Sequence, residues 1–347
     1  MRLVSEQERN EPKPHGGIAL YPFIQHFNLT FGGKTRTTFR EFLQANSKCQ
    51  RWLMLSDYAF YDQNKNSDVA TFTFVPLPLP SSFDDLVSRI QAAAPTDLKH
   101  SSQVRPEFIS LIKDNPTFSV SVILDRERKM SAAENTDLKR DLKMLRQMVE
   151  TWKSRGDPTT FPTIAKDLRT LGNALSRNGV NMRLVRDLMI VSNLAGYLAF
   201  QFQDVLLLAE LTWATDRDSM HSFLLPKCSN SLFHTLADLL SHSLCEREGL
   251  STNFRRFTFE TPEPEGPLRY DALLRIPDLI CGTLADMRAE IGQRVVATHK
   301  KFNAAIDGLL ADEKSQAILT IQFDTETHEP RAFRSIFETT NGAPVQA

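Results

Sequence analysis

Three apolar, strand-like runs in this sequence end in an aspartate. RWLMLSD ends in Asp57, FSVSVILD ends in Asp125 and VLLLAELTWATD ends in Asp216. A fourth aspartate, Asp278, lies in YDALLRIPDLICG, an apolar stretch typical of a buried helix. Because strands bring the side chains at their ends to a shared edge of a sheet, acids that are distant in the sequence can meet there. Carboxylates that meet repel one another, and they are tolerated where they share protons or hold a cation.

Each aspartate also has a simpler interpretation. An aspartate that ends a strand commonly faces water in a turn, and Asp125 begins the charged run DRER, which is typical of a solvated turn. Asp216 competes with Asp218, since strand alternation would aim both to one side. Asp278 follows Pro277, and a carboxylate there could cap a helix instead of binding a metal.

The order of the elements predicts a mixed α/β fold. Apolar or alternating runs rich in β-branched and aromatic residues indicate strands, and segments with helical periodicity lie between them. The expected strands are 51–57, 69–78, 117–125, 205–216, 254–261 and 317–324. Three consecutive helical segments fill 131–203, with breakers at 156–158 and 178–181. This succession favours a mixed sheet flanked by helices, with a helical insertion.

A chain of 347 residues is long enough for two domains or for one large domain with an insertion. The sequence predicts a disordered N-terminus, a core in two parts separated by the helical stretch, and a flexible tail. The expected boundaries are 1–17 for the N-terminus, 18–130 for the first part of the core, 131–203 for the helical insertion or cap, 204–330 for the second part and 331–347 for the tail.

Composition excludes several classes of protein. The formal net charge is −1, so binding to nucleic acid would need a local basic face. The four cysteines show no C-x-x-C spacing, which argues against zinc and favours reduced thiols. No apolar signal segment or membrane-length apolar run is present in the sequence, so we expect a cytoplasmic, bacterium-like protein without a membrane partner. Walker A, Rossmann, G-x-S-x-G and H-E-x-x-H motifs are absent from the sequence.

The order of the motifs resembles the bacterial family called domain of unknown function 3800, which has a ribonuclease-H-like core. The similarity covers roughly residues 50 to 290 through short motifs. LMLSDYAFYD matches the opening strand and its Asp57, DLKHSS matches a lysine segment through Lys99, and SVILDRE matches a strand end through Asp125. LTWATDRD matches a later acidic strand through Asp216, and LLRIPDLICG matches the last motif through Asp278.

The resemblance implies a ribonuclease-H-like mixed sheet and a metal-dependent nuclease that cleaves phosphodiester bonds. It implies Mg²⁺ or Mn²⁺ as the cofactor and nucleic acid as the partner. Asp57, Asp125, Asp216 and Asp278 would then be metal ligands, with Asp57 bridging two ions. Asp57, Asp216, Asp278 and Lys99 would be the catalytic residues, since a lysine beside the metals can neutralise the transferring phosphate.

One departure from the family motif keeps a second hypothesis open. The family places a second acid directly after the first, whereas Asp57 is followed here by Tyr58 and Ala59. Asp62 is the nearest further acid, and it lies in a loop. The alternative is a catalytically silent ribonuclease-H-like interaction protein of mobile-element or phage-defence systems, whose helical stretch 131–203 would contact a protein partner.

Overall fold

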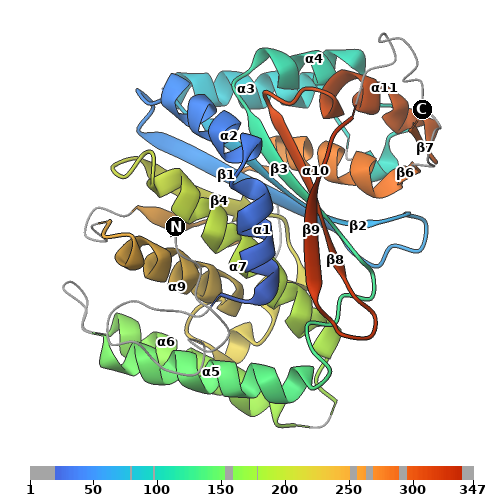
Figure 1. Cartoon of the computed structure of the whole chain (residues 1–347). Helices are drawn as coiled ribbons and strands as arrows, with labels where there is room; N and C mark the ends of the chain where they lie inside the picture. Colours follow the sequence, from blue (N-terminus) through green and yellow to red (C-terminus); the bar gives the residue numbers. More distant parts are fainter. Residues whose placement is uncertain are drawn as a thin grey trace.

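A computed structural model of the chain describes residues 20–78, 80–96, 98–152, 159–177, 179–250, 256–262, 269–288 and 295–337. Within these ranges a seven-stranded mixed sheet crosses the molecule, and helices cover both of its faces (Figure 1). The strand order is β5-β4-β1-β2-β3-β8-β9. The prediction of a mixed α/β fold with a sheet flanked by helices is therefore confirmed. The expected disorder of residues 1–17 lies outside the described residues.

The centre of the sheet is a three-stranded antiparallel meander, extended on both sides. The meander consists of β1 (Arg51–Ala59), β2 (Asp68–Pro76) and β3 (Phe118–Leu124). On one side β4 (Glu210–Thr215) pairs parallel with β1, and β5 (Phe257–Phe259) pairs parallel with β4. On the other side β8 (Gln316–Phe323) pairs parallel with β3, and β9 (Pro330–Ser335) pairs antiparallel with β8. A separate short ribbon joins β6 (Met287–Arg288) and β7 (Val296–Ala297).

The helices divide into two layers and a peripheral pair. One face of the sheet is covered by α1 (Pro22–Phe31), α2 (Lys34–Ala45), α7 (Met182–Gln203) and α9 (Leu232–Arg247). The other is covered by α3 (Pro80–Ala93), α4 (Pro106–Asp114), α10 (Asp271–Asp286), α11 (Asn303–Ala305) and the π-helical turn η6 (Ile306–Leu310). The peripheral pair is α5 (Glu134–Thr151) and α6 (Thr160–Leu175), and the short helices are η2 (Leu98–His100), α8 (Ser219–Ser222), η3 (Leu225–Lys227) and η5 (Lys300–Phe302).

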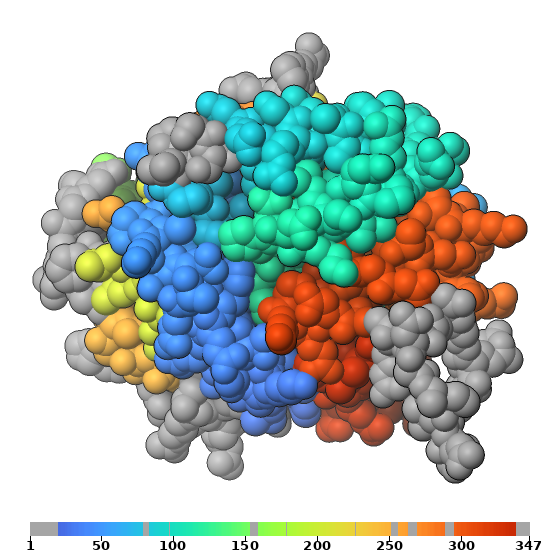
Figure 2. Space-filling view, turned by 90° about the horizontal axis from the view of Figure 1, so that it is seen from above, coloured from blue at the N-terminus to red at the C-terminus, as the bar shows by residue number. Residues whose placement is uncertain are grey.

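Alternation along β1 separates two hydrophobic cores. Trp52 and Met54 face the α7 and α9 layer, whereas Leu53 and Leu55 face the α10 layer. Viewed from above, the segment that carries α3 and α4 lies beside the orange-red C-terminal segment (Figure 2). Because successive residues of a strand point to opposite faces, Asp57 continues the side of Leu53 and Leu55. The strand pattern thus aims this acid at the α10 layer.

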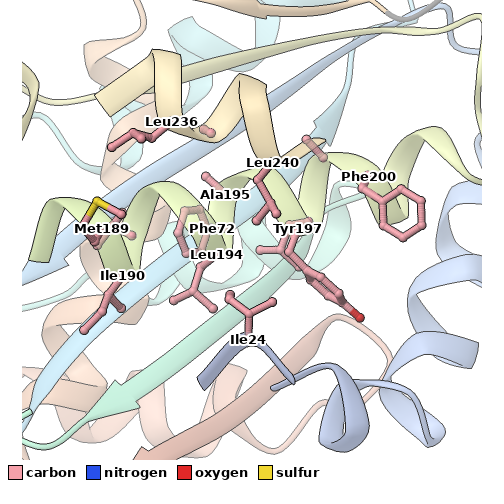
Figure 3. Close-up of a cluster of buried hydrophobic side chains, with 14 of the residues drawn as sticks. Ile24, Phe72, Met189, Ile190, Leu194, Ala195, Tyr197, Phe200, Leu236 and Leu240 are labelled. Atoms are coloured by element: carbon pink, nitrogen blue, oxygen red, sulfur yellow. The ribbon is translucent and has the colours of Figure 1, made fainter. Parts of the chain in front are cut away.

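Helix α7 is buried on every side from Asp187 to Gln203. Leu194 and Ala195 of α7 belong to one buried cluster with Phe72 of the sheet, Leu240 of α9 and Ile24 of α1 (Figure 3). Gly196 permits the close approach of the two helices, because a Cβ atom there would overlap the Ala237 carbonyl oxygen. A helix buried from all directions belongs to the core of a protein. The helical stretch 131–203 is therefore not one uniform insertion: α5 and α6 pack on each other, while α7 belongs to the main core.

The C-terminal segment differs from the sequence expectation. Residues 331–347 were expected to form a flexible tail, but Pro330–Ser335 forms β9 on the edge of the sheet. The Thr30 hydroxyl of α1 donates a hydrogen bond of 3.0 Å to the Ala332 carbonyl and ties this strand to the α1 layer. The segment RAFRS alternates only weakly between apolar and polar residues, so its periodicity did not indicate a strand. Residues 338–347 lie outside the described part of the chain.

Candidate acidic site

Asp57 and Asp216 lie side by side at the ends of two neighbouring parallel strands. The register of β1 and β4 pairs Ser56 with Thr215, so the next residue on each strand is an aspartate. Ala214 shares the α10-facing core with Leu55, and the aspartates lie two residues beyond each of them on the same face. Asp57 is half-buried and Asp216 is exposed. The structure therefore brings together two of the acids that the sequence singled out.

Asp278 approaches the same place from α10. This helix packs on β1 and β2 and begins at Asp271, with Pro277 inside it. Asp278 therefore lies two turns into the helix, and the interpretation of Asp278 as a helix cap is wrong. Its half-buried carboxylate lies one turn from Cys281 on the same helix.

Cys281 connects Asp278 with Asp57. Its buried thiol hydrogen-bonds to Asp57 and also lies 3.4 Å from the Val69 carbonyl oxygen, to which it can donate. Burial raises the pKa of Cys281 well above its ordinary value, and the negative charges of Asp57 and Asp278 raise that pKa further. The Cys281 thiol therefore interacts with both carboxylates, with Asp278 on its own helix and with Asp57 on β1.

Lys99 supplies a positive charge near this group of acids. It lies on the 3₁₀ turn η2, on an exposed segment between α3 and α4. The charge of Lys99 lowers the pKa of Asp57, which shows that the ammonium group is close enough to interact with the carboxylate. We use the name acidic site for Asp57, Asp216 and Asp278 together with Lys99.

Burial and a neighbouring negative charge both raise the pKa of the Asp57 carboxyl group. Burial raises the pKa of Asp57 to about 6, and the negative charge of Asp216 raises it as well. Hydrogen bonds from the Tyr58 backbone and from Cys281, together with the charge of Lys99, oppose this rise. The acidic site therefore carries more negative charge than its own cation offsets, which is the condition under which a bound cation stabilises a protein.

A row of small polar side chains continues from Asp57 across the sheet. Asp57 pairs in register with Thr71 of β2, and Thr71 pairs with Ser121 of β3. The Thr71 and Ser121 hydroxyls are 2.9 Å apart and fully buried. Their small size leaves room for α10 to approach the sheet closely, and their mutual hydrogen bond satisfies them without a charge.

The structure does not bring Asp125 to the acidic site, contrary to the sequence prediction. Ser121 is the β3 residue in the row of Asp57, and Asp125 lies four residues further along, about 13 Å by strand geometry and two strands away. Its carboxylate instead accepts a hydrogen bond of 2.8 Å from the Phe323 backbone N–H. Asp125 is therefore a local anchor between the ends of β3 and β8, and the metal ligand role predicted for it has no geometric support.

Neither Tyr58 nor Asp62 replaces the second acid of the opening motif. Strand alternation turns Tyr58 to the face opposite Asp57, where its hydroxyl and the Ser56 hydroxyl are 2.5 Å apart. Asp62 is exposed, and its carboxylate accepts a hydrogen bond of 2.9 Å from the Asn64 backbone in a tight turn. Neither side chain adds an oxygen ligand to the acidic site.

The fit of a metal ion depends on how many protein ligands it needs. Among the described residues, no group of three or more His, Cys, Asp and Glu side chains is placed to hold a metal ion. A cage made only of protein ligands therefore does not fit. Magnesium, however, is commonly bound by one or two carboxylates, with waters and substrate phosphates as its remaining ligands. The adjacent carboxylates of Asp57 and Asp216 fit that second kind of site.

A buried ionic group elsewhere in the sheet was not found by sequence reasoning. Arg128 is fully buried and lies between Asp68 at 2.6 Å and Asp187 at 2.9 Å. The Tyr61 hydroxyl donates to Asp187 at 3.1 Å. We call Arg128, Asp68, Asp187 and Tyr61 the arginine cluster. The run DRER resembles a solvated turn, and only the alternation of buried and exposed charges in the folded chain distinguishes Arg128 from Arg126.

A second unpredicted group closes the hairpin between β1 and β2 against α10. The carboxylate of Asp286 is fully buried and contacts the Lys65 ammonium at 3.1 Å and His299 Nδ1 at 2.5 Å. The sequence signal available for this group was weak, because Asp286 ends an apolar helix and its partners are distant in the chain. His221 and His234 pack edge to face, with ring centroids 5.0 Å apart.

Comparison with known proteins adds no family assignment. No protein-family model, no curated protein and no solved structure matches this chain. Within the described residues, the structure contains no helix that is long and apolar enough to cross a membrane.

Proposed function

We propose that this protein is a metal-dependent, nuclease-like protein that acts on phosphodiester bonds of nucleic acid. The observation that carries the proposal is the register that sets Asp57 and Asp216 next to each other on parallel strands, with Lys99 and Cys281 interacting with Asp57 and with Asp278 one turn from Cys281 on α10. The pair would hold Mg²⁺ or Mn²⁺, and the bound ion would polarise a phosphoryl oxygen and activate water.

The topology of the sheet supports a ribonuclease-H-like core for this proposal. The meander β1-β2-β3 is extended at β1 by two parallel strands, β4 and then β5. This is the arrangement expected of a ribonuclease-H-like sheet, in which the leading acid lies on the central first strand. Here β1 carries Asp57 in that position, while β8 and β9 extend the opposite edge of the sheet.

The residues of the site would divide the work by their charge and burial. Asp57 and Asp216 would bind the cation and orient it, and Asp278 would add negative charge from α10 that draws the cation toward the sheet. Lys99 would contact a phosphate oxygen and offset the charge that develops during transfer. Cys281, which is held neutral by its raised pKa, would fix the orientation of Asp57 through its hydrogen bond.

The direct test is cleavage of labelled oligonucleotides. Wild-type protein with Mn²⁺ or Mg²⁺ should cleave single-stranded DNA or RNA, and Asp57→Asn or Asp216→Asn should lower the rate at least 100-fold with folding intact. Asp84→Asn is the matched control, because Asp84 is exposed on α3. Cleavage by Asp57→Asn at the wild-type rate would contradict the proposal.

A silent interaction protein with the same core is the second candidate, and one observation favours it. Tyr58 occupies the position of the second acid, and no described group supplies three metal-ligating side chains. In that case α5 and α6, which pack on each other at the periphery, would contact a protein partner. This candidate requires that no divalent ion binds at Asp57 and that partner binding survives in Asp57→Asn.

A further inference from the structure

The turn that carries Lys99 is held by another lysine from a distant part of the sequence. Lys301 lies on η5, about 200 residues further along the chain. Its ammonium group donates to the Leu98 carbonyl at 2.6 Å and to the Ser101 carbonyl at 3.1 Å. These two carbonyls lie on either side of Lys99 and His100. The ammonium of Lys301 therefore closes the loop from which Lys99 reaches toward Asp57.

Lys301 is itself anchored to the helix that carries Asp278. Its neighbour Phe302 is almost fully buried and packs on α10, where a Cβ atom at Gly282 would lie 3.4 Å from the Phe302 ring. The Lys301 ammonium lies 5.1 Å from the centroid of the Phe302 ring, within range of a cation–π interaction. Lys301 thus connects the turn that carries Lys99 with α10, the helix that carries Asp278.

A 3₁₀ turn of three residues is weak without such support. Its hydrogen bonds are fewer and poorer than those of an α-helix, and its carbonyls would otherwise be shared with water. Hydrogen bonds from a charged donor are roughly twice as strong as neutral ones. Two of them on one turn restrict the directions in which the Lys99 side chain can point.

We propose that Lys301 is a positioning residue that holds the Lys99 turn against the acidic site. The inference rests on the proposed function, because Lys99 is the group that would meet the phosphate. Lys301 contacts neither Asp57 nor the substrate in this account, and it acts only through the Leu98 and Ser101 carbonyls.

A double-mutant cycle separates positioning from a general structural role. The rate of oligonucleotide cleavage is measured for Lys99→Met, Lys301→Met and the double variant. Lys301→Met should lower kcat about tenfold with little change in KM. The double variant should be no slower than Lys99→Met alone, because Lys301 affects the rate only through the position of Lys99. Lys301→Arg, which can donate to both carbonyls, should recover most of the rate. Multiplicative losses would overturn the proposal.

Amide hydrogen exchange supplies a readout that does not depend on cleavage. Lys301→Met should speed exchange at the Ser101 amide, which donates to the Leu98 carbonyl, whereas Lys300→Met should not, because Lys300 is exposed on the same turn. Unchanged exchange in Lys301→Met would show that Lys301 does not hold the turn. Absence of cleavage by the wild type would instead contradict the proposed function, so the two failures are distinguishable.

Discussion

The acidic site and the arginine cluster show two ways in which one protein holds acids inside its fold. In the arginine cluster, a buried guanidinium lies within 3 Å of both carboxylates, Asp68 and Asp187. In the acidic site, the cation that acts on Asp57 is Lys99, on an exposed turn, and the residue beside Asp57 on the neighbouring strand segment is another aspartate, Asp216. The first group is complete without a ligand. The second gains from a cation that the chain does not supply.

The direction of each electrostatic effect supports this contrast. Burial raises the pKa of Asp187 to about 6, and Arg128 is the strongest influence that opposes the rise. Burial raises the pKa of Asp57 to about 6 as well, but there the neighbouring Asp216 adds to the rise. A protein cation is therefore the main charge that opposes burial in the arginine cluster, whereas in the acidic site the like charge of Asp216 outweighs the cation Lys99.

The largest expected effect comes from removing the cation of the arginine cluster. Arg128→Met removes the closest cation from two buried carboxylates and leaves Asp68 only the more distant Arg126 at 3.7 Å, so the free energy of unfolding should fall by about 3–5 kcal/mol at pH 7. Urea unfolding followed by circular dichroism measures this. Arg140→Met is the matched control, because Arg140 forms an exposed pair with Asp137, and the change there should stay within about 1 kcal/mol. Equal losses of stability in both variants would show that the arginine cluster is no more stabilising than an exposed ion pair, and the contrast with the acidic site would not hold.

Asp57→Asn should have the opposite sign. The folded-state pKa of Asp57 lies above the unfolded value of about 4, so the wild type loses stability as pH rises from about 4 to about 6. The amide removes this cost, and Asp57→Asn should be about 1–2 kcal/mol more stable than wild type at pH 8. At pH 4 the difference should vanish. Urea unfolding at both pH values, without divalent ions, is the measurement, and destabilisation at pH 8 would refute the account of Asp57.

The smallest expected effect concerns Asp125, which sequence reasoning grouped with the acidic site. Asp125→Asn keeps one carbonyl oxygen to accept the Phe323 N–H, so the loss of stability should be about 1 kcal/mol or less. Oligonucleotide cleavage, if present in the wild type, should be unchanged within a factor of two. A loss of cleavage comparable to that in Asp216→Asn would show that Asp125 belongs to the site after all.

The sequence was sufficient to predict strands and the face of the sheet to which their residues point. It was insufficient where the role of a residue depends on a contact with a distant part of the chain. Apolar runs located β1, β3 and β4, and the same runs identified Asp57 and Asp216 as strand-end acids. The relation of Asp125 to them depends on register, since a shift of four residues along β3 has no signature in the sequence. Arg128 was missed for a related reason, because burial of a charge depends on distant partners such as Asp187.

The hydrophobic periodicity of the sequence also did not predict the edge strand β9. The segment RAFRS became β9 because an edge strand needs only one partner, which β8 provides. Within the stretch 131–203, which was predicted as a helical insertion or cap, α5 and α6 pack on each other, whereas α7 is buried from Asp187 to Gln203. Helical periodicity correctly predicted the helix α7. It did not reveal that α7 packs on α9, whereas α5 and α6 pack on each other.

Binding of a divalent ion to the native protein is the decisive test of a cation site at Asp57 and Asp216. An ion that binds only the folded state stabilises it by about 2.7 kcal/mol at a hundredfold excess over its Kd. For a chain of this length that corresponds to a rise in Tm of about 4 °C, from the decline of the shift with size. Mn²⁺ should produce this rise in the wild type and in the Asp125→Asn and Asp84→Asn variants, and the rise should disappear in Asp57→Asn and in Asp216→Asn. An unchanged Tm in wild-type protein, or an equal rise in Asp57→Asn, would contradict the assignment of Asp57 and Asp216 as a cation site.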